Sequence, residues 1–224
     1  SLLPQTWKGV KLNLIDTPGY ADFIGEVKSG LRVSEGAIIV VCAASGVEVG
    51  TEQMWHDAEK MKLPRLIFVN KMDRDNADFF RTLEEIQIKL SARCLAVQIP
   101  IGSQSDLQGA VDLITMKGYI GSDLQETELP QALAETVAAH REKLIEAIVE
   151  IDDALITQYL EGTPLSNEEL SEALKKSTIA GKVVPIFAGS ALRSIGVESL
   201  MDAICSYLPF PEEKDAIIAT NPTT

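Results

Sequence analysis

Several features that would assign a sequence to a particular class of protein are scarce in these 224 residues. The longest apolar run, Ala37 to Ala44, is far too short to span a bilayer, so we expect no membrane partner. The cysteines lie far apart in apolar segments, with no spacing suited to a metal site; they are Cys42, Cys94 and Cys205. This pattern predicts reduced core thiols in a cytoplasmic protein.

Basic residues are also few, with 20 Lys and Arg against 33 Asp and Glu, for a net charge of -13. This charge argues against a main contact with a phosphate backbone, so we expect no direct DNA binding. The excess is uneven, because residues 123–176 hold 13 acidic and 4 basic residues. A hydrophobic content of 46% still predicts a packed core.

Apolar stretches alternate with amphipathic ones along most of the chain. Leu2–Trp7 and Val10–Asp16 flank Lys8-Gly9, which predicts two adjacent strands joined by a tight turn. Continuous apolar patterns predict buried strands at Ala37–Ala43, Arg65–Asn70, Cys94–Ile99 and Val183–Ala188. Helical patterns lie between or after them, at residues 21–33, 51–62, 77–90 and 197–208. The fold class is therefore α/β, with a mostly parallel sheet and helices on both faces.

The alternation of buried strands and helices is interrupted from Gly102 to Gly181. Short strands are predicted at 110–114 and 116–120, a polar loop at 121–129, and helices at 132–151, 153–160 and 168–180, the last opened by a capping box at Ser166–Glu169. We therefore expect one domain from residues 1–101 and 182–210, an inserted acidic α+β subdomain at 102–181, and a linker toward a following domain at 211–224.

The first of three notable loops is Asp16-Thr17-Pro18-Gly19, which follows a predicted strand. An acid at a strand's end can hold Mg²⁺ through water, and the N–H of a glycine can approach a phosphate closely. The same four residues also make an ordinary turn. Asp16, Thr17, Pro18 and Gly19 are thus candidate nucleotide contacts, with Asp16 the candidate Mg²⁺ residue.

The second loop, Asn70-Lys71-Met72-Asp73, is the most specific signal in the sequence. An aspartate accepts two parallel hydrogen bonds from the N1–H and exocyclic amine of guanine, and adenine offers no such pair of donors. We therefore expect Asp73 to select guanine, Lys71 to lay its alkyl stem along the base, and Asn70 to bridge the base edge to neighbouring loops. In isolation, the tetrapeptide would be more typical of a polar turn after a strand.

The third loop, Gly189-Ser190-Ala191, could direct backbone N–H groups at the base carbonyl, although alone it is only a strand-to-helix turn. The three loops follow successive predicted parallel strands, and open α/β sheets bind ligands at that edge. Their order along the chain is what makes them informative together.

With these loops in place, the sequence resembles the translational GTPases, and most closely the G domain of elongation factor G and its relatives. The resemblance rests on residues 13–23, 36–46, 64–74 and 189–191 and covers essentially the whole chain. It implies a P-loop-GTPase-type sheet, GTP/GDP and Mg²⁺ as cofactors, the ribosome as partner and a monomer. Asp16 would be the Mg²⁺-linked acid and Gly19 the γ-phosphate contact that starts the mobile second switch. The insertion would face ribosomal stalk proteins, or its acids would simply form a solvated helix face.

Two departures from that family stand out. The phosphate-binding loop Gly-x-x-x-x-Gly-Lys-[Ser/Thr] and the first switch are absent, so we expect a fragment that lacks its first, central strand and binds GTP poorly by itself. Tyr20 stands where the family has the histidine that positions the attacking water. The parent would be a GTPase with a translocation-type role; alternatives are a ribosome-protection or release-factor-type GTPase, or a slow GTP-dependent binding switch.

Overall fold

The computed structural model describes residues 1–19 and 21–213. The strands in this part of the chain are β1 (Leu2–Trp7), β2 (Val10–Ile15), β3 (Ala37–Cys42), β4 (Arg65–Asn70), β5 (Cys94–Ala96), β6 (Gln98–Ile101), β7 (Gly109–Asp112), β8 (Lys117–Ile120), β9 (Gln125–Thr127) and β10 (Val184–Ala188). The α-helices are α1 (Ile24–Val33), α2 (Val49–Lys60), α3 (Phe79–Lys89), α4 (Ala134–Val149), α5 (Asp153–Leu160), α6 (Asn167–Ile179) and α7 (Val197–Tyr207).

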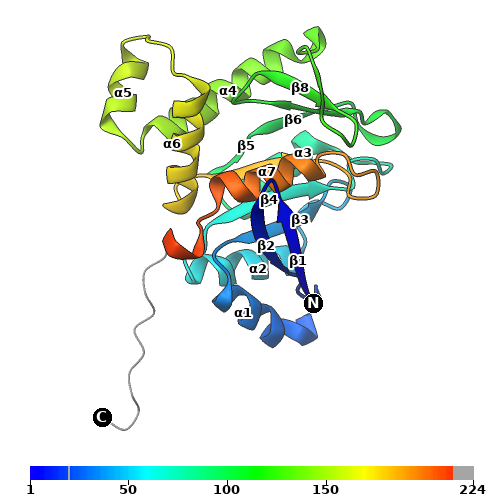
Figure 1. Ribbon diagram of the computed structural model, residues 1–224. Helices are drawn as coiled ribbons and strands as arrows, with labels where there is room; N and C mark the ends of the chain where they lie inside the picture. The colour runs from blue at the N-terminus through cyan, green and yellow to red at the C-terminus, as the bar shows by residue number, and fades with distance from the viewer. Residues whose placement is uncertain (20, 214–224) are drawn as a thin grey trace, which may run out of the picture.

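A parallel sheet with the order β3-β4-β10-β5 forms the centre of the molecule (Figure 1). Its strands come from the continuous apolar stretches, and every residue of β10 is buried. Strand β10 lies between β4 and β5 although about ninety residues separate β5 from it in the chain. Helices cover both faces of this sheet, as the sequence predicts for an α/β fold.

The N-terminal strands β1 and β2 form a separate antiparallel hairpin, with Trp7 opposite Val10. Lys8 and Gly9 both have positive φ, at 46° and 84°, as the expected tight turn requires. However, β2 alternates between half-buried and exposed residues and is not part of the parallel sheet, so our expectation that the first loop follows a strand of that sheet is wrong. In the described part of the chain β2 pairs with β1 alone, and its other edge therefore has no strand partner there.

The stretch Cys94–Ile99 is not one strand but parts of two. Strand β5 joins the parallel sheet, while β6 begins a second, antiparallel sheet with the order β6-β7-β8-β9. Val97 connects them, because its N–H donates to Ile186 O at 3.0 Å and its carbonyl accepts from Leu113 N at 2.9 Å. The backbone thus changes sheets at one residue without leaving the apolar core.

Three further local expectations change in detail. The polar loop expected at 121–129 contains the edge strand β9, whose three residues are too few and too polar to show a strand pattern. Helix α1 is preceded by a 3₁₀ turn at Ala21–Phe23. Helix α3 begins at Phe79, two residues later than expected, and is capped by Asp78, whose side chain accepts from Arg81 N–H. The predicted capping box of α6, Ser166 with Glu169, is confirmed.

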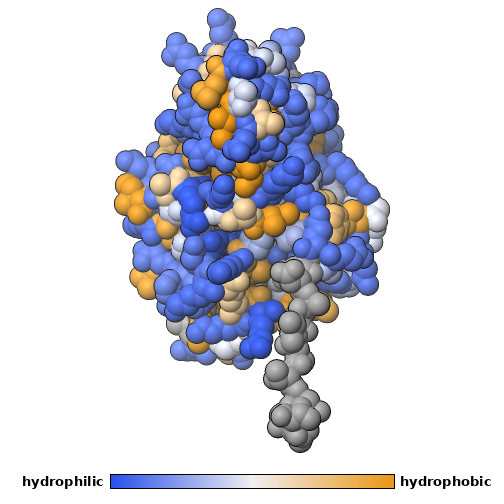
Figure 2. All heavy atoms as spheres, turned by 90° about the vertical axis from the view of Figure 1, so that its left-hand side faces the viewer, coloured by the Kyte–Doolittle hydropathy of each residue, from blue (hydrophilic) through white to orange (hydrophobic). Residues whose placement is uncertain are grey.

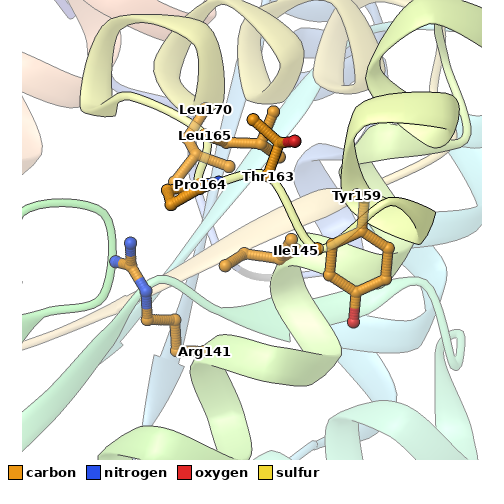
Figure 3. A pocket seen from close by; sticks show the side chains of 8 residues that line it. Arg141, Ile145, Tyr159, Thr163, Pro164, Leu165 and Leu170 are labelled. Atoms are coloured by element: carbon orange, nitrogen blue, oxygen red, sulfur yellow. The ribbon is translucent and has the colours of Figure 1, made fainter.

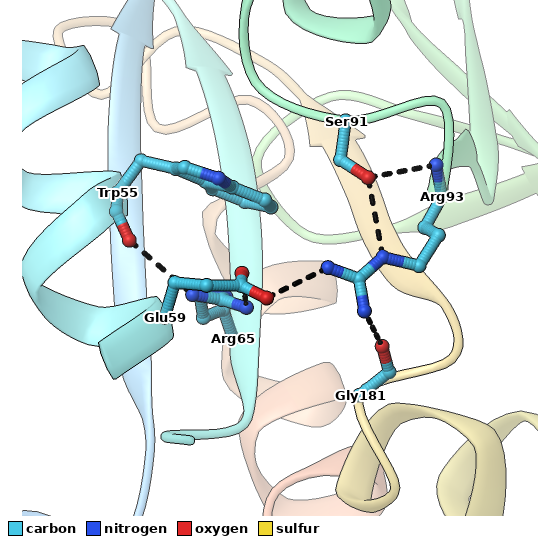
Figure 4. A network of polar contacts seen from close by, with 6 residues as sticks. All are labelled: Trp55, Glu59, Arg65, Ser91, Arg93 and Gly181. Carbon is cyan, nitrogen blue, oxygen red and sulfur yellow. Dashed lines mark hydrogen bonds and ion pairs between the residues drawn. The ribbon is translucent and has the colours of Figure 1, made fainter. Parts of the chain in front are cut away.

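Charged side chains join α2 to the sheet at the edge opposite the loops described below (Figure 4). Arg65, at the start of β4, is 4% exposed, stacks 4.2 Å from the Trp55 ring centroid and pairs with Glu59 of α2. Glu59 also accepts from Arg93 Nη2 at 2.8 Å, and Arg93 Nη1 donates to Gly181 O at 2.6 Å. One carboxylate thereby connects α2 to β4 and to the turn where the chain returns from α6.

Most of the surface on the α5–α6 side is hydrophilic, with apolar residues in small separate groups (Figure 2). Beneath it, a single cluster of buried apolar residues extends from the parallel sheet into the second sheet and the helices α4 and α6. Val97, Leu144 and Ile186, for instance, are all fully buried in this cluster. No helix within residues 1–19 and 21–213 is long and apolar enough to cross a membrane.

Candidate functional site

The loops after β4 and β10 meet through one amide side chain. Asn70, the last residue of β4, accepts two backbone N–H groups at its Oδ1 atom, from Lys71 at 2.7 Å and from Ala191 at 2.9 Å. Because both contacts need an acceptor, they fix the orientation of the amide and direct Nδ2 elsewhere. Two loops 121 residues apart in sequence are thereby held together at the carboxyl edge of the sheet.

Met72 anchors this arrangement from inside. Its side chain is fully buried, its N–H donates to Gly189 O at 3.1 Å, and its carbonyl accepts from Gln104 N at 2.7 Å. Met72 therefore supports the loop, and its side chain has no exposed surface to offer a ligand. Gln104, at the start of the region expected to be inserted, is a supporting contact that the sequence did not reveal.

The two charged residues of the second loop are directed differently from Met72. Lys71 is exposed and has a left-handed φ of 62°. Asp73 is half-buried, and no hydrogen bond or ion pair to its carboxylate is found within the described residues. An unengaged carboxylate at this edge is available to accept hydrogen bonds from a ligand.

The third loop uses its own N–H groups within the protein. Gly189 N–H donates to Val69 O at 3.0 Å, and Ser190 N–H donates to Ile195 O at 2.9 Å. Ser190 is fully buried, whereas Ala191 is exposed. An N–H group of this loop could therefore reach a base carbonyl only by giving up its present acceptor. The Ala191 N–H is the exposed one, and its present acceptor is Asn70 Oδ1.

The first loop precedes α1 in the chain and lies near both α1 and the start of α2 in space. Asp16 is exposed, and its backbone continues the β1–β2 ladder through hydrogen bonds with Ser1 of 2.8 and 2.7 Å. A hollow of about 430 Å³ adjoins it, lined by Asp16, Thr17 and Pro18 together with residues of α1. A Cβ atom built on Gly50, at the start of α2, would lie 3.9 Å from Gly19 O. Tyr20, the expected catalytic position, lies outside the described residues.

The three loops are thus only partly brought together. The Asn70–Asp73 and Gly189–Ala191 loops share hydrogen bonds, but none joins either of them to Asp16–Gly19 in the part of the chain that the structure describes. No group of three or more His, Cys, Asp or Glu side chains suited to a metal occurs among the described residues. A metal held at Asp16 would therefore take most of its ligands from water or phosphate.

Cys42 is not the core thiol that the sequence predicts, because it is partly exposed at the end of β3, opposite Asn70 in the ladder. Burial raises the pKa of its thiol, yet hydrogen bonds from Ser45 and Ala44 outweigh burial and lower the pKa below its usual value. Cys94, by contrast, is buried, and burial raises its pKa to about 12. Of these two thiols, Cys94 alone lies in the core, as predicted.

A second hollow, of about 300 Å³, lies far from these loops between α4 and the segment from α5 to α6 (Figure 3). Its walls are mostly apolar, with Ile145, Leu165 and Leu170 among them. Arg141 points toward it, but this guanidinium already donates to the carbonyls of Leu113 and Ile114. The hollow thus offers no unengaged charge for a ligand.

Comparison with known proteins assigns the chain to a family. The family described as the elongation factor Tu GTP-binding domain matches residues 3–210. The chain belongs to this family. A crystal structure of a protein from Thermus thermophilus is also similar, with 34% sequence identity and a TM-score of 0.87 over 95% of this chain.

These matches confirm the resemblance to translational GTPase G domains and the α/β fold with its additional antiparallel sheets. The chain covers 32% of the Thermus thermophilus protein, so it spans about a third of that relative's length.

Proposed function

We propose that this chain is part of the GTP-binding domain of an elongation-factor-G-like GTPase that acts on the ribosome. The observation that carries the proposal is the joint made by Asn70 Oδ1 with the N–H groups of Lys71 and Ala191. It brings a guanine-type loop and a Ser-Ala loop to the edge where α/β sheets bind ligands. Family membership supports GTP and GDP as the nucleotides.

Base selection would rest on Asp73. Its carboxylate has no partner among the described residues and can accept both the N1–H and the exocyclic amine of guanine. Asn70 Nδ2, directed away from Oδ1 and its two donors, can donate to an acceptor on the base edge. The exposed stem of Lys71 can cover one face of the ring.

The phosphate end would rest on Asp16 and Gly19. An exposed carboxylate beside an open hollow suits a Mg²⁺ ion held through water, because Mg²⁺ keeps several of its waters in proteins. Gly19 would contact the γ-phosphate, and Thr17 and Pro18 would shape the loop between these two residues. Loss of the γ-phosphate would then release the segment that leads into α1.

An exchange of base specificity tests this assignment. Asp73→Asn replaces one carboxylate oxygen by a donor, which suits the C2 carbonyl of xanthine and no longer suits the amine of guanine. In the full-length protein we expect GDP affinity to fall by roughly 10³-fold or more, and affinity for xanthosine diphosphate to rise. Asp75→Asn, at an exposed position two residues away, is the matched control. Unchanged GDP affinity in the Asp73 variant would refute the assignment.

We further propose that residues 1–224 alone bind GTP poorly, because a phosphate-binding loop and its lysine supply most contacts to the β- and γ-phosphates in such enzymes. Calorimetry on the 224-residue chain is therefore expected to detect no micromolar GTP binding. Micromolar binding would show that the loops described here are sufficient.

The cellular role rests on positions outside this site. We propose a cytoplasmic, monomeric parent with a translocation-type role, in which residues 102–181 face ribosomal stalk proteins between the two parts of the G domain. Tyr20 favours one alternative, a slow GTP-dependent switch, because tyrosine has no imidazole nitrogen to orient water. The other alternative is a ribosome-protection or release-factor-type role, which the loops described here do not distinguish from translocation.

Tyr20→His in the full-length protein is expected to raise ribosome-stimulated GTP hydrolysis. Phosphate release with and without ribosomes measures it. No change, or a fall, would mean that Tyr20 is already competent.

A further inference from the structure

Arg81 holds carbonyl oxygens from two different loops. Its Nη2 atom lies 3.1 Å from Ala43 O, 2.8 Å from Ala44 O and 3.5 Å from Asn76 O. Ala43 and Ala44 follow β3, whereas Asn76 lies three residues after Asp73. One guanidinium therefore links the loop after β3 to the loop that carries the base-selecting acid.

The backbone between Asp73 and Asn76 has little freedom of its own. Arg74 N–H donates to Lys71 O and Ala77 N–H donates to Arg74 O, both at 3.1 Å, so two successive turns fold the segment back. Asn76 completes them with a φ of 62°, a left-handed conformation that asparagine adopts more readily than most other residues. Because the segment is short and folded, the place where Asn76 is held determines where Asp73 stands.

Local helix energetics do not explain an arginine at this position. Arg81 is the third residue of α3, and its N–H donates to the capping carboxylate of Asp78 at 3.0 Å. The first turn of a helix carries partial positive charge and favours acids, and the third position favours Glu or Gln in particular. The contacts of the guanidinium with three carbonyls compensate for this placement.

The backbone of Ala43 also connects to the guanine-type loop. Ala43 O also accepts from Asp78 N at 3.1 Å, while Ala43 N–H donates to Asn70 O at 2.9 Å. The Ala43 backbone is thus hydrogen-bonded both to Asn70 and to the beginning of α3. Arg81 contacts the carbonyls of Ala43 and Asn76 and so links Ala43 to the loop after Asp73 as well.

We propose that Arg81 is a positioning residue for guanine selection, which holds Asp73 in register with Asn70 by fixing Asn76 against Ala43 and Ala44. The inference rests on the proposed function, since it concerns the same base site. It assigns to α3 a part in specificity that neither the three loops nor the family match contains.

Hydrogen exchange on the 224-residue chain tests whether Arg81 holds the loop. In Arg81→Met we expect the amides of residues 71–78 to exchange about tenfold faster, because the bridging contacts are lost. Arg81→Lys, which keeps the charge but lacks the planar fork, should give a smaller increase. Arg32→Met, at an exposed position of α1, is the matched control. Wild-type exchange in both Arg81 variants would overturn the proposal.

Nucleotide discrimination in the full-length protein tests the consequence for specificity. Inosine diphosphate lacks the exocyclic amine, so a well-placed Asp73 should prefer GDP to it by about ten- to a hundredfold. In Arg81→Met this preference for GDP should fall by about threefold or more. A merely structural role would instead weaken the binding of both nucleotides equally and leave the ratio of their affinities unchanged.

An unchanged ratio in Arg81→Met would therefore overturn the proposal even if both affinities fell. A wild-type protein without any preference for GDP would instead contradict the proposed function, and the exchange rates would still decide whether Arg81 holds the loop.

Discussion

At the scale of single residues, backbone conformation decides which side chains are tolerated beside the candidate site. Gly46 follows β3 with a φ of 75°, and a Cβ atom there would lie 2.3 Å from Glu85 Oε2. That oxygen accepts the Val47 N–H at 3.1 Å, and Lys89 of the same helix donates to Val47 O at 3.2 Å. Side chains of α3 therefore bind both the N–H and the carbonyl of Val47. Because Gly46 has no Cβ, Glu85 has room to make its contact.

Gly46→Ala should lower the free energy of unfolding by at least about 2 kcal/mol, from the left-handed φ and from the lost Glu85–Val47 hydrogen bond. Gly162→Ala is the matched control, because Gly162 has a φ of 73° with nothing within 4 Å of the added Cβ. It should lose only about 1 kcal/mol. Urea unfolding of both variants measures the difference, and equal losses would mean that Glu85 yields without cost.

At the scale of secondary-structure elements, the Glu59 carboxylate fastens α2 to the sheet by pairing with Arg65 and Arg93 (Figure 4). Burial raises the pKa of Glu59, but the hydrogen bond from Arg93 and the charge of Arg65 outweigh it and hold the pKa below the usual range. The unfolded chain then binds the proton more tightly than the folded one. The stability from this pairing is therefore present above the usual glutamate pKa, about 4.3, and is lost as the pH falls further.

Glu59→Gln should cost about 2 kcal/mol of unfolding free energy at pH 7, because the Arg65 guanidinium stays buried without its counter-charge. The difference from the wild type should narrow as the pH falls below about 4.3, because the unfolded chain there binds a proton at Glu59 more tightly than the folded chain does. Urea unfolding across that range measures it. Glu52→Gln, at an exposed position on the same helix, should show neither effect. A difference that does not depend on pH would contradict the ion-pair explanation.

At the scale of the whole molecule, the two sheets share one apolar core, so we expect the described regions to unfold together. Trp7 and Trp55 both lie outside residues 102–181, so tryptophan fluorescence reports on the rest of the chain. Circular dichroism is dominated by helices, and the helices α4, α5 and α6 lie within residues 102–181. Fluorescence and circular dichroism should therefore give coincident urea unfolding curves. Two separate midpoints would show that residues 102–181 form an independent unit.

The sequence alone determined those features that depend on neighbours along the chain. The β-branched run of β3, the Lys8-Gly9 turn and the Ser166–Glu169 capping box each follow from local spacing, and the structure has all three. The Asn70-Lys71-Met72-Asp73 pattern, likewise local, suggested guanine, and together with the other two loops it suggested the family. Strand β9 escaped prediction because three residues carry too short a period.

Only the tertiary structure decided which of these residues meet. The hydrogen bond from Ala191 to Asn70 joins positions 121 apart, and the grip of Arg81 on Ala43 joins α3 to the end of a different strand. It also showed that Met72 is buried, that Cys42 is partly exposed beside the site and that β2 stands apart from the parallel sheet. Local sequence fixes backbone preference and periodicity, whereas burial and long-range hydrogen bonds depend on how distant elements pack.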